Sequence, residues 1–427
     1  MKILVIGSGG REHALVDTLA RENTAVELVA APGNPGIAEQ ARCVAVSAGD
    51  PRAVTALAER EAADLVVIGP EAPLAAGAVD LLRQHRIPVF GPTQAAATVE
   101  TSKAATKALM LAAGIPTAHA ETHRDVDEAK AAVRSRFGAP VVIKASGLAA
   151  GKGVIVCQSE AEAFAAIDRI LGDRTFGEAG AECLVESFMT GEELSLFAVT
   201  DGHDVLPMLG AQDHKRLLEG DEGPNTGGMG AYTPVSLAMP ALIDDVTERI
   251  FLPTLHALRK QGTPFTGLLY AGLMLTPEGP KVVEFNCRFG DPETQAILPM
   301  LASSLLDPML AVARGARIGS HPAFTWRSGA SVTTVVASAG YPDAPTTGAP
   351  MELPETDPSV ARIYHAGTSR DGAGQLRTSG GRVVAVTGFG DTLAAARAAS
   401  RDTASRVAFD GAIMRRDIGW REAARLG

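Results

Sequence analysis

Residues 281–293 read Lys-Val-Val-Glu-Phe-Asn-Cys-Arg-Phe-Gly-Asp-Pro-Glu. An apolar run at 265–275 and a Pro-Glu-Gly-Pro turn precede them, so this part of the chain is predicted to form a β-hairpin. Alternate side chains of a strand share a face, which would group Val282, Glu284 and Asn286, the last two about 6.7 Å apart along the strand. A carboxylate and an amide oxygen are therefore expected side by side.

The chemistry of that strand face favours a metal site. Mg²⁺ binds oxygen ligands and keeps water and substrate phosphates in its shell, so one carboxylate and one amide are a sufficient protein contribution. If the strand continues, Arg288 joins the face, where its planar guanidinium can hold a carboxylate or a phosphoryl oxygen in bidentate fashion. A Glu-x-Asn pair alone is more often part of a solvated strand face than a metal site, and the adjoining run 288–293 shifts the balance toward the metal site.

Upstream of this hairpin, the first hundred residues alternate short apolar runs with alanine-rich helical stretches, which predicts a parallel sheet covered by helices. A helix is expected at 100–113, and Gly114-Ile115-Pro116 ends it. A small α+β unit of the kind that serves as a lid is predicted next. Its strands are expected at 141–144, 154–157, 184–188 and 194–199, and its helix at 160–171.

Residues 212–232 form a predicted loop rich in glycine and polar residues, too long for a plain connection in a compact domain. The loop is interpreted as a substrate loop, with a solvated mobile loop as the alternative. The last hundred residues are predicted to form a separate unit that starts near Phe324. Strands are expected there at 331–337 and 382–387, and a helix at 392–407.

Two glycine-rich turns are candidates for phosphate binding. Residues 7–10, Gly-Ser-Gly-Gly, lie between a predicted strand and a predicted helix, so they form either a phosphate cradle at a helix N-terminus or a structural tight turn. Glu12 stands where a dinucleotide-binding motif would have its third glycine, which disfavours NAD. Residues 147–153, Gly-Leu-Ala-Ala-Gly-Lys-Gly, read as a hairpin that closes over phosphates, and Lys144 before them either neutralises phosphate charge or reaches the surface.

The composition limits the class of protein. The 427 residues, 46% hydrophobic and 21% charged, suit a folded chain of several domains. A net charge of −10 disfavours a nucleic-acid or anionic-membrane binder, and no apolar stretch approaches the roughly 18 residues that span a bilayer. Four scattered cysteines without a Cys-x-x-Cys pair and the absence of a secretory signal lead us to expect a cytoplasmic protein.

Six blocks of the sequence resemble the phosphoribosylamine–glycine ligase family of ATP-grasp enzymes, in the family's order and across the whole chain. The blocks are 7–14, 69–74, 147–153, 212–216, 223–232 and 284–293. The resemblance implies a multidomain α/β and α+β protein with an open parallel α/β N-terminal domain, an ATP-grasp core with a mobile lid, and a small α+β C-terminal domain. The expected domains are 1–101, 102–324 with the lid at about 117–190, and 325–427.

The resemblance also implies a reaction. ATP, glycine and 5-phospho-D-ribosylamine would give glycinamide ribonucleotide, ADP and phosphate through a glycyl phosphate, the second step of de novo purine synthesis. The implied metal is Mg²⁺ or Mn²⁺. The protein is expected to be a monomer or weak dimer, with a possible transient contact to the amidotransferase that makes its substrate.

Individual roles follow from the same resemblance. The lysines and the lid would contact ATP phosphates, the hinge would receive adenine, and a following acid would hold the ribose; these residues are Lys103, Lys144, Gly147, Gly151, Lys152, Gly153, Glu186, Phe188, Met189 and Glu193. The metal ligands would be Glu284 and Asn286, and the catalytic residues Arg288, Lys144 and Asp213. Glycine and the ribosylamine would be bound by Gly9, Gly10, Arg11, Asn34, Asp213, Thr226, Gly227, Gly228, Arg288 and Asp291.

The sequence departs from the family pattern at two places. Ser146 stands where the family has an Asp before the first lid glycine, and the run 270–273, Tyr-Ala-Gly-Leu, stands where ATP-grasp enzymes usually have a strand acid. Phosphate oxygens are therefore expected to complete the metal shell. Three alternatives stay open: an ATP-grasp enzyme acting on another acid such as bicarbonate or formate, a nicotinamide-dependent oxidoreductase, and a nucleotide-binding module without catalysis.

Overall fold

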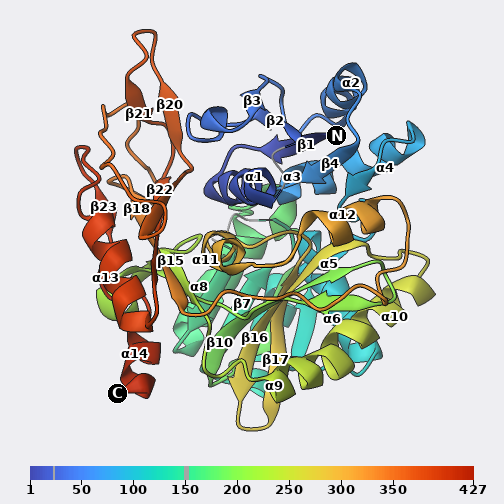
Figure 1. Cartoon of the computed structure of the whole chain (residues 1–427). Helices are drawn as coiled ribbons and strands as arrows, with labels where there is room; N and C mark the ends of the chain where they lie inside the picture. Colours follow the sequence, from blue (N-terminus) through green and yellow to red (C-terminus); the bar gives the residue numbers. More distant parts are fainter. Residues whose placement is uncertain (23–24, 149–152) are drawn as a thin grey trace.

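The computed structural model describes residues 1–22, 25–148 and 153–427. The N-terminal part is an open parallel sheet in the order β3-β2-β1-β4-β5, as the alternating pattern predicted. Its strands are buried on both faces because helices cover them (Figure 1). The elements are β1 Lys2–Gly7, α1 Gly10–Glu22, β2 Glu27–Pro32, β3 Arg42–Cys43, α2 Pro51–Glu61, β4 Leu65–Ile68, α3 Glu71–Ala75, α4 Ala78–Gln84 and β5 Val89–Phe90.

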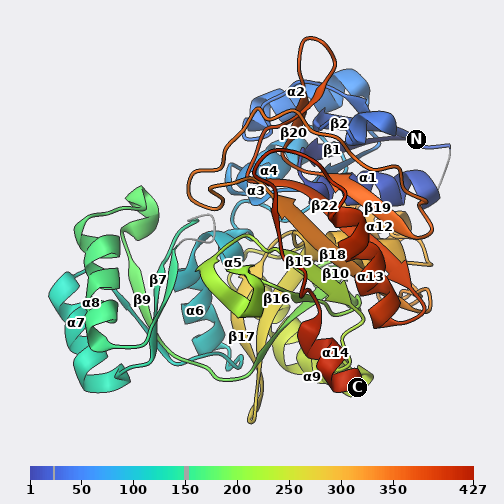
Figure 2. The same cartoon turned by 90° about the vertical axis from the view of Figure 1, so that its left-hand side faces the viewer.

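The predicted lid is a four-stranded antiparallel sheet, in the order β6-β9-β7-β8, that stands out from the rest of the molecule (Figure 2). It has a hydrophobic cluster of its own. The expected helix is an α-helix that passes into a π-helical turn at Asp168–Gly172. The elements are β6 Ala120–His123, α7 Val126–Ala132, β7 Val141–Ala145, β8 Val154–Cys157, α8 Glu160–Ile167 and β9 Cys183–Ser187.

The next strand, β10, was wrongly grouped with the lid. It pairs over its full length with β16 in a second antiparallel sheet, ordered β11-β10-β16-β17. Hydrophobic periodicity identifies a strand but does not say which sheet receives it. The elements of this part are α5 Thr98–Thr101, α6 Lys103–Ala112, β10 Glu192–Thr200, β11 Val205–Pro207, α9 Pro240–Val246, α10 Leu252–Lys260, β16 Gly267–Thr276 and β17 Gly279–Asn286.

The predicted hairpin is formed by β16 and β17, but its alternation is not strict. Gly272 pairs with Glu284 and Leu273 with Val282, so Val283 has no partner and forms a β-bulge. Val282 consequently belongs to the same core cluster as Phe285. The expectation that Val282 shares a face with Glu284 and Asn286 is therefore wrong.

The C-terminal sheet recruits strands from residues 212–232, so the prediction that this segment forms a loop without strands is wrong. The sheet order is β12-β15-β18-β22-β19, with β23 beside β18. Helix α13 packs on it (Figure 1). The elements are β12 Gln212–Asp213, β13 Arg216–Leu218, β14 Glu222–Asn225, β15 Gly230–Thr233, α11 Glu293–Ile297, α12 Leu306–Ala313, β18 Ala330–Ala337, β19 Ala361–His365, β20 Thr368–Arg370, β21 Leu376–Thr378, β22 Arg382–Gly390, α13 Leu393–Ala404, β23 Ile413–Met414 and α14 Trp420–Leu426.

One hydrophobic cluster joins the N-terminal sheet to the second sheet. It runs from Leu4 and Val66 through Leu109 of α6 to Leu269 and Phe285. This shared core fixes the end of β17 against α3 and α5. Within the described residues, no helix is long and apolar enough to cross a bilayer.

Candidate active site

Glu284 lies near the end of β17 among positively charged side chains. Burial raises the pKa of its carboxyl, but Lys215, Lys144, Lys103 and Arg288 together outweigh that effect and lower the pKa below its ordinary value. The side chain is only partly enclosed. An ionised carboxylate is thus available to a ligand at this point.

Asn286, two residues further along β17, is buried, and its Oδ1 accepts a long hydrogen bond of 3.4 Å from Arg288 Nη2. The two side chains supply one carboxylate and one amide oxygen, a donor set that suits Mg²⁺ when water and phosphate complete the shell. Across residues 1–22, 25–148 and 153–427, no group of three or more His, Cys, Asp or Glu side chains could hold a metal by itself.

Arg288 is held by two acidic side chains that the sequence did not point to. Its Nε lies 3.2 Å from Glu71 Oε2 on α3, and its Nη2 lies 3.0 Å from Glu100 Oε1 on α5. The second oxygen of Glu100 accepts a 2.8 Å hydrogen bond from the backbone N–H of Cys287. The guanidinium therefore has a fixed orientation, set by helices about 190–220 residues away in sequence.

The predicted ATP lysines meet at the base of the lid. Lys144 Nζ lies 2.8 Å from Glu186 Oε2 and also donates to the carbonyl of Val283. Lys103 donates from Nζ to the carbonyl of Gly147 at 3.1 Å. Gly153 is the first described residue after 149–152. Its carbonyl accepts a hydrogen bond from the N–H of Ala145, which closes the β7–β8 hairpin. Gly151 and Lys152, predicted for the same lid, lie outside the described residues.

The hinge and ribose positions lie between the two sheets. Phe188 and Met189 occupy the connection from β9 to β10; Phe188 is 40% exposed and Met189 is half-buried. The exposed aromatic residue leaves a surface on which a base can stack. Glu193, at the start of β10, forms an ion pair with Lys215.

Asp213 is the most strongly perturbed acid at the site. Burial, together with the negative charges of Glu293, Glu193 and Glu284, raises its pKa to about 7 against the opposing effect of Lys215. The sequence pointed to Asp213 but not to Glu293. Glu293 accepts hydrogen bonds from Tyr270 Oη at 2.7 Å and Ser195 Oγ at 3.1 Å.

The glycine turn at residues 7–10 is packed around a buried acid. Glu12 Oε2 accepts a 2.6 Å hydrogen bond from the N–H of Gly9, and its other oxygen lies 2.6 Å from Arg11 Nε. A Cβ on Gly7, Gly9 or Gly69 would come within 2.2–2.8 Å of Glu12. These glycines consequently have a structural reason to be glycine, whether or not the turn also receives a phosphate.

A Cβ at Gly10 would lie 2.6 Å from the side-chain amide of Gln295, so Gly10 also has a structural reason to be glycine.

Asn34, predicted to bind substrate, uses its side-chain amide within the chain. Its Nδ2 donates to the carbonyls of Ser8 and His365, both at 2.8 Å. Its Oδ1 accepts from the N–H groups of Gly36 and Ile37. Asn34 thus links the N-terminal turn to the C-terminal sheet.

The remaining predicted substrate residues meet around Arg382 on β22. Its Nη1 donates to the carbonyl of Gly227 at 2.6 Å, with a longer contact to Gly228, and its Nη2 lies 3.0 Å from Asp291 Oδ2. Thr226 Oγ1 accepts from the N–H of Gly228. Arg382 was missed because no local motif surrounds it.

Three family models cover most of the chain. They are the N domain of phosphoribosylglycinamide synthetase at residues 1–100, its ATP-grasp (A) domain at 101–294 and its C domain at 331–421. The chain belongs to the phosphoribosylglycinamide synthetase family. It is accordingly an ATP-grasp ligase with the three-part architecture that the resemblance implied.

Individual relatives agree with this family. A phosphoribosylamine–glycine ligase of Ralstonia nicotianae is 48% identical with both chains fully covered, and one of Streptomyces coelicolor is 47% identical over 99% of this chain and all of its own. The crystal structure of phosphoribosylamine–glycine ligase from Thermotoga maritima has a TM-score of 0.86 at 34% identity, covering 98% of this chain and all of that one. A biotin carboxylase domain of Hydrogenobacter thermophilus, in complex with MgADP and bicarbonate, covers 97% of this chain and 91% of its own, with a TM-score of 0.72 at 18% identity, and shows the shared fold.

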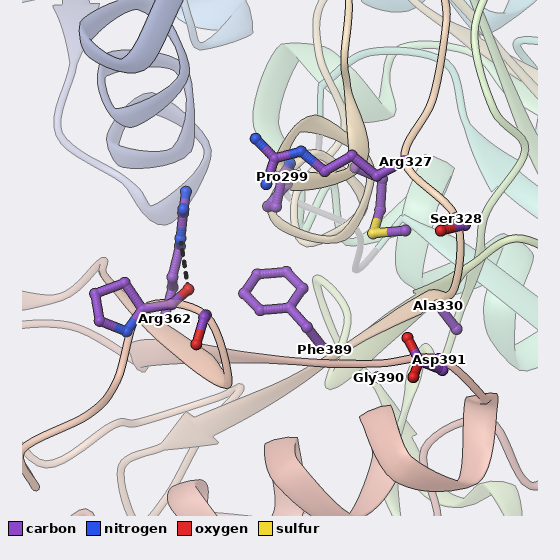
Figure 3. Close-up of a pocket in the computed structure, with 11 residues that line it drawn as sticks. Pro299, Arg327, Ser328, Ala330, Arg362, Phe389, Gly390 and Asp391 are labelled. Carbon is purple, nitrogen blue, oxygen red and sulfur yellow. Dashed lines mark hydrogen bonds between the residues drawn. The ribbon is translucent and has the colours of Figure 1, made fainter.

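This member of the phosphoribosylglycinamide synthetase family also has a hollow of about 390 Å³, shown in Figure 3. Arg327, Arg362 and Phe389 line it, and Arg362 is already paired with Asp17 at 2.7 Å. The hollow contains none of the predicted site residues. The candidate active site is therefore the group of charged side chains around Glu284.

Proposed function

We propose that this chain joins glycine to 5-phospho-D-ribosylamine at the expense of ATP, giving glycinamide ribonucleotide, ADP and phosphate in the second step of de novo purine synthesis. The observation that carries the proposal is the position of Glu284 and Asn286 beside Lys103, Lys144, Lys215 and Arg288 in a chain of this family. Oxygen ligands for a divalent cation and a cluster of cationic side chains for phosphate and carboxylate groups together fit phosphoryl transfer to a carboxylate.

The first step forms glycyl phosphate. A carboxylate oxygen of glycine attacks the γ-phosphorus, a new O–P bond forms, and the bond to the ADP oxygen breaks. Lys144 and Lys103 hold the transferred group and Arg288 holds the glycine carboxylate, so catalysis rests on positioning and charge neutralisation. Mg²⁺ or Mn²⁺ held by Glu284 and Asn286 would neutralise charge on the β- and γ-phosphates.

In the second step, the ribosylamine nitrogen attacks the acyl carbon, the C–O bond to phosphate breaks, and the nitrogen loses a proton, which the departing phosphate takes up. Asp213 binds the amino group of glycine, since it lies in a strongly acidic part of the site. Thr226, Gly227 and Gly228 receive the ribosylamine phosphate together with the glycine turn. No protein nucleophile is required.

The adenosine end of ATP is assigned to the hinge and the lid. Adenine lies against Phe188 and Met189 beside Glu186, the ribose hydroxyls bond to Glu193, and the lid closes over the phosphates. The exposed ring of Phe188 and the place of Glu193 at the start of β10 support this assignment.

A coupled ADP assay with phosphoribosylamine generated in place tests the proposal. ADP should form only when glycine and the ribosylamine are both present, and bicarbonate or formate should not replace glycine. Glu284→Ala should reduce turnover at least 100-fold without unfolding the protein, because a metal-held phosphoryl transfer loses its charge neutralisation. Glu278→Gln, at the exposed turn of the same hairpin, is the matched control and should keep normal turnover.

Near-normal turnover of Glu284→Ala would defeat the metal assignment, whereas ADP release with bicarbonate or formate alone would defeat the substrate assignment. A chain that binds ATP but releases no ADP with any acid would be a nucleotide-binding module. Replacing Mg²⁺ by Mn²⁺ in the same assay measures the metal preference.

The molecular organisation is part of the same proposal. We place the domains at 1–101, 102–324 and 325–427, with the lid at about 117–190, in keeping with its separate hydrophobic cluster. A monomer or weak dimer, a cytoplasmic location and a transient contact with the amidotransferase that supplies the ribosylamine complete the proposal. Four free cysteines fit a reducing compartment.

A further inference from the structure

Two buried lysines share one buried carboxylate beneath the lid. Glu186 of β9 places Oε2 2.8 Å from Lys144 Nζ on β7 and Oε1 3.2 Å from Lys107 Nζ on α6. All three residues are less than 5% exposed. Lys107 was not among the predicted site residues, although it stands one helical turn after Lys103.

The two lysines differ in how many acceptors they have. An ammonium group carries three N–H donors. Lys107 uses them on Glu186, on Thr117 Oγ1 at 2.7 Å and on the carbonyl of Ala118 at 3.4 Å. Lys144 has two acceptors among the residues described here, Glu186 and the carbonyl of Val283.

Lys107 is thus anchored, and Lys144 keeps one donor for a further partner. Lys144 Nζ donates at 3.2 Å to the carbonyl of Val283, the residue before Glu284, which places Lys144 on the active-site side of the group. Lys107 contacts the loop 117–118 at the base of the lid instead. Of the two lysines, Lys144 therefore faces the active site, and Lys107 faces the residues at the base of the lid.

The charge balance explains why two lysines are present. A buried carboxylate that loses its only cation is strongly destabilised, so a lone Lys144 would remain committed to Glu186. With Lys107 in place, Glu186 keeps a cation when Lys144 turns to a phosphate. Two lysines and one glutamate also leave a net charge of about +1, which attracts an anion, whereas one lysine and one glutamate would leave none.

We propose that Lys107 is a positioning residue that keeps Glu186 neutralised and thereby releases the Lys144 ammonium to bind a nucleotide phosphate. The proposal rests on the proposed function in one respect, namely that Lys144 contacts ATP. Lys107 itself touches no substrate.

The test measures binding of a non-hydrolysable ATP analogue and of adenosine, which lacks phosphates, to the full-length protein. Lys107→Met should weaken binding of the ATP analogue at least tenfold and leave the affinity for adenosine within about twofold, because only phosphate binding needs the released ammonium of Lys144. Lys130→Met is the matched control. Lys130 pairs with Asp168 at 2.6 Å between α7 and the end of α8, and its substitution should change the affinity for neither ligand.

A double variant separates positioning from a merely structural role. Lys107→Met with Glu186→Gln removes one positive and one negative charge, so the net charge of about +1 returns and most of the lost analogue affinity should be recovered. Lys107→Arg, which keeps the charge, should bind the analogue within about threefold of the unmodified protein. Thermal unfolding of each variant shows whether it is folded.

Three results would overturn the inference: unchanged analogue binding in folded Lys107→Met, an equal loss for adenosine, or no recovery in the double variant. If Lys107→Met does not fold, a tenfold loss of analogue affinity in folded Lys107→Arg would overturn the inference instead. If the unmodified protein binds no ATP analogue at all, the proposed function fails; if it binds and Lys107→Met binds equally, only the role of Lys107 fails.

Discussion

Asp213 and Glu284 are neighbouring carboxyl groups whose pKa values move in opposite directions. Both lose solvent, which raises the pKa of a carboxyl. Glu284 faces four cationic side chains, whose combined attraction exceeds the cost of burial. Asp213 has one cation, Lys215, and three carboxylates around it, so its pKa rises to about 7. The difference lies in the charges nearby rather than in the depth of burial.

The raised pKa of Asp213 predicts a pH-dependent loss of stability. Its ordinary value is 3.8, so between about pH 4 and 7 the folded chain holds a proton that the unfolded chain has released. Stability from this group therefore falls as pH rises through that window and stays level above it. Asp213→Asn should melt higher than the unmodified protein by a margin that grows to about 2 °C or more by pH 7.5.

Calorimetric melting from pH 4.5 to 8 measures this margin. Asp371→Asn is the control with the opposite sign, because hydrogen bonding to Arg377 lowers the pKa of Asp371 and its ionised form is stabilising. A margin for Asp213→Asn that does not change with pH would show that the carboxyl ionises normally.

Arg288 allows a second prediction at the residue scale. Glu71 and Glu100 hold its guanidinium from two sides, a geometry that a lysine ammonium does not reproduce. Arg288→Lys should raise the KM for glycine about 10–100-fold, equivalent to the roughly 1.5–3 kcal/mol of a hydrogen bond to a charged group. Arg317→Lys, at an exposed pair with Asp204, should leave the KM unchanged. An unaltered glycine KM in Arg288→Lys would remove Arg288 from the glycine site.

At the scale of elements, the sequence predicted what is encoded locally. The β16–β17 hairpin, three of the four lid strands (β7, β8 and β9) and the helix near 392–407 follow from periodicity and turn residues, and the structure contains them. The remaining lid strand, β6, was not predicted. The bulge at Val283 and the pairing of β10 with β16 depend on a partner strand, which periodicity in one segment does not contain. The strands β12 and β15 were missed because glycine and polar residues obscure short strands that the C-terminal sheet completes. The strands β13 and β14, also missed, pair with each other in a separate two-stranded sheet.

Gly69, directly after β4, gives a prediction about packing against Glu12 of α1. A Cβ on Gly69 would lie 2.2 Å from Glu12 Oε1 and 2.5 Å from its Cγ, and Glu12 is only 2% exposed. Gly69→Ala must displace Glu12 from the N–H of Gly9, so it should reduce the free energy of unfolding by about 1–3 kcal/mol. Chemical denaturation measures the loss.

Gly49→Ala is the matched control for this variant. No atom lies within 4 Å of a Cβ at Gly49, and its backbone is not in the left-handed region. The change should be neutral or slightly stabilising, because alanine restricts the unfolded chain more than glycine does. Equal stability of the two variants would mean that Glu12 moves aside without cost.

At the scale of the whole molecule, the candidate site is assembled from distant parts of the chain. The sequence identified Glu284, Asn286, Lys144 and Asp213 because each lies in a recognisable block. Most of their partners lie in segments without a motif: Glu100 on α5, Lys107 on α6 and Arg382 on the C-terminal sheet. Glu71 lies in the block 69–74, but the sequence assigned it no role. Only the folded chain brings charge and countercharge together, so single-sequence reasoning finds the reactive groups and misses what positions them.

Arg382 tests whether the C-terminal sheet takes part in substrate binding. It fastens Gly227 and Asp291 to β22 through hydrogen bonds of 2.6 and 2.7 Å to their carbonyls and an ion pair of 3.0 Å to the Asp291 carboxylate. Arg382→Met should cost about 2–3 kcal/mol of stability. It should also raise the KM for phosphoribosylamine at least tenfold, because both loops lose their attachment, while the KM for ATP stays within about twofold.

Arg377→Met provides the comparison, since Arg377 likewise joins a carboxylate and a carbonyl, Asp371 and Gly348, but does so on β21 away from the site. It should lose stability without a change in either KM. If Arg382→Met raised both KM values equally, Arg382 would support the fold in general. If it raised neither, the loops at 226–228 and 291 would not bind the ribosylamine, and the N-terminal glycine turn would have to hold its phosphate alone.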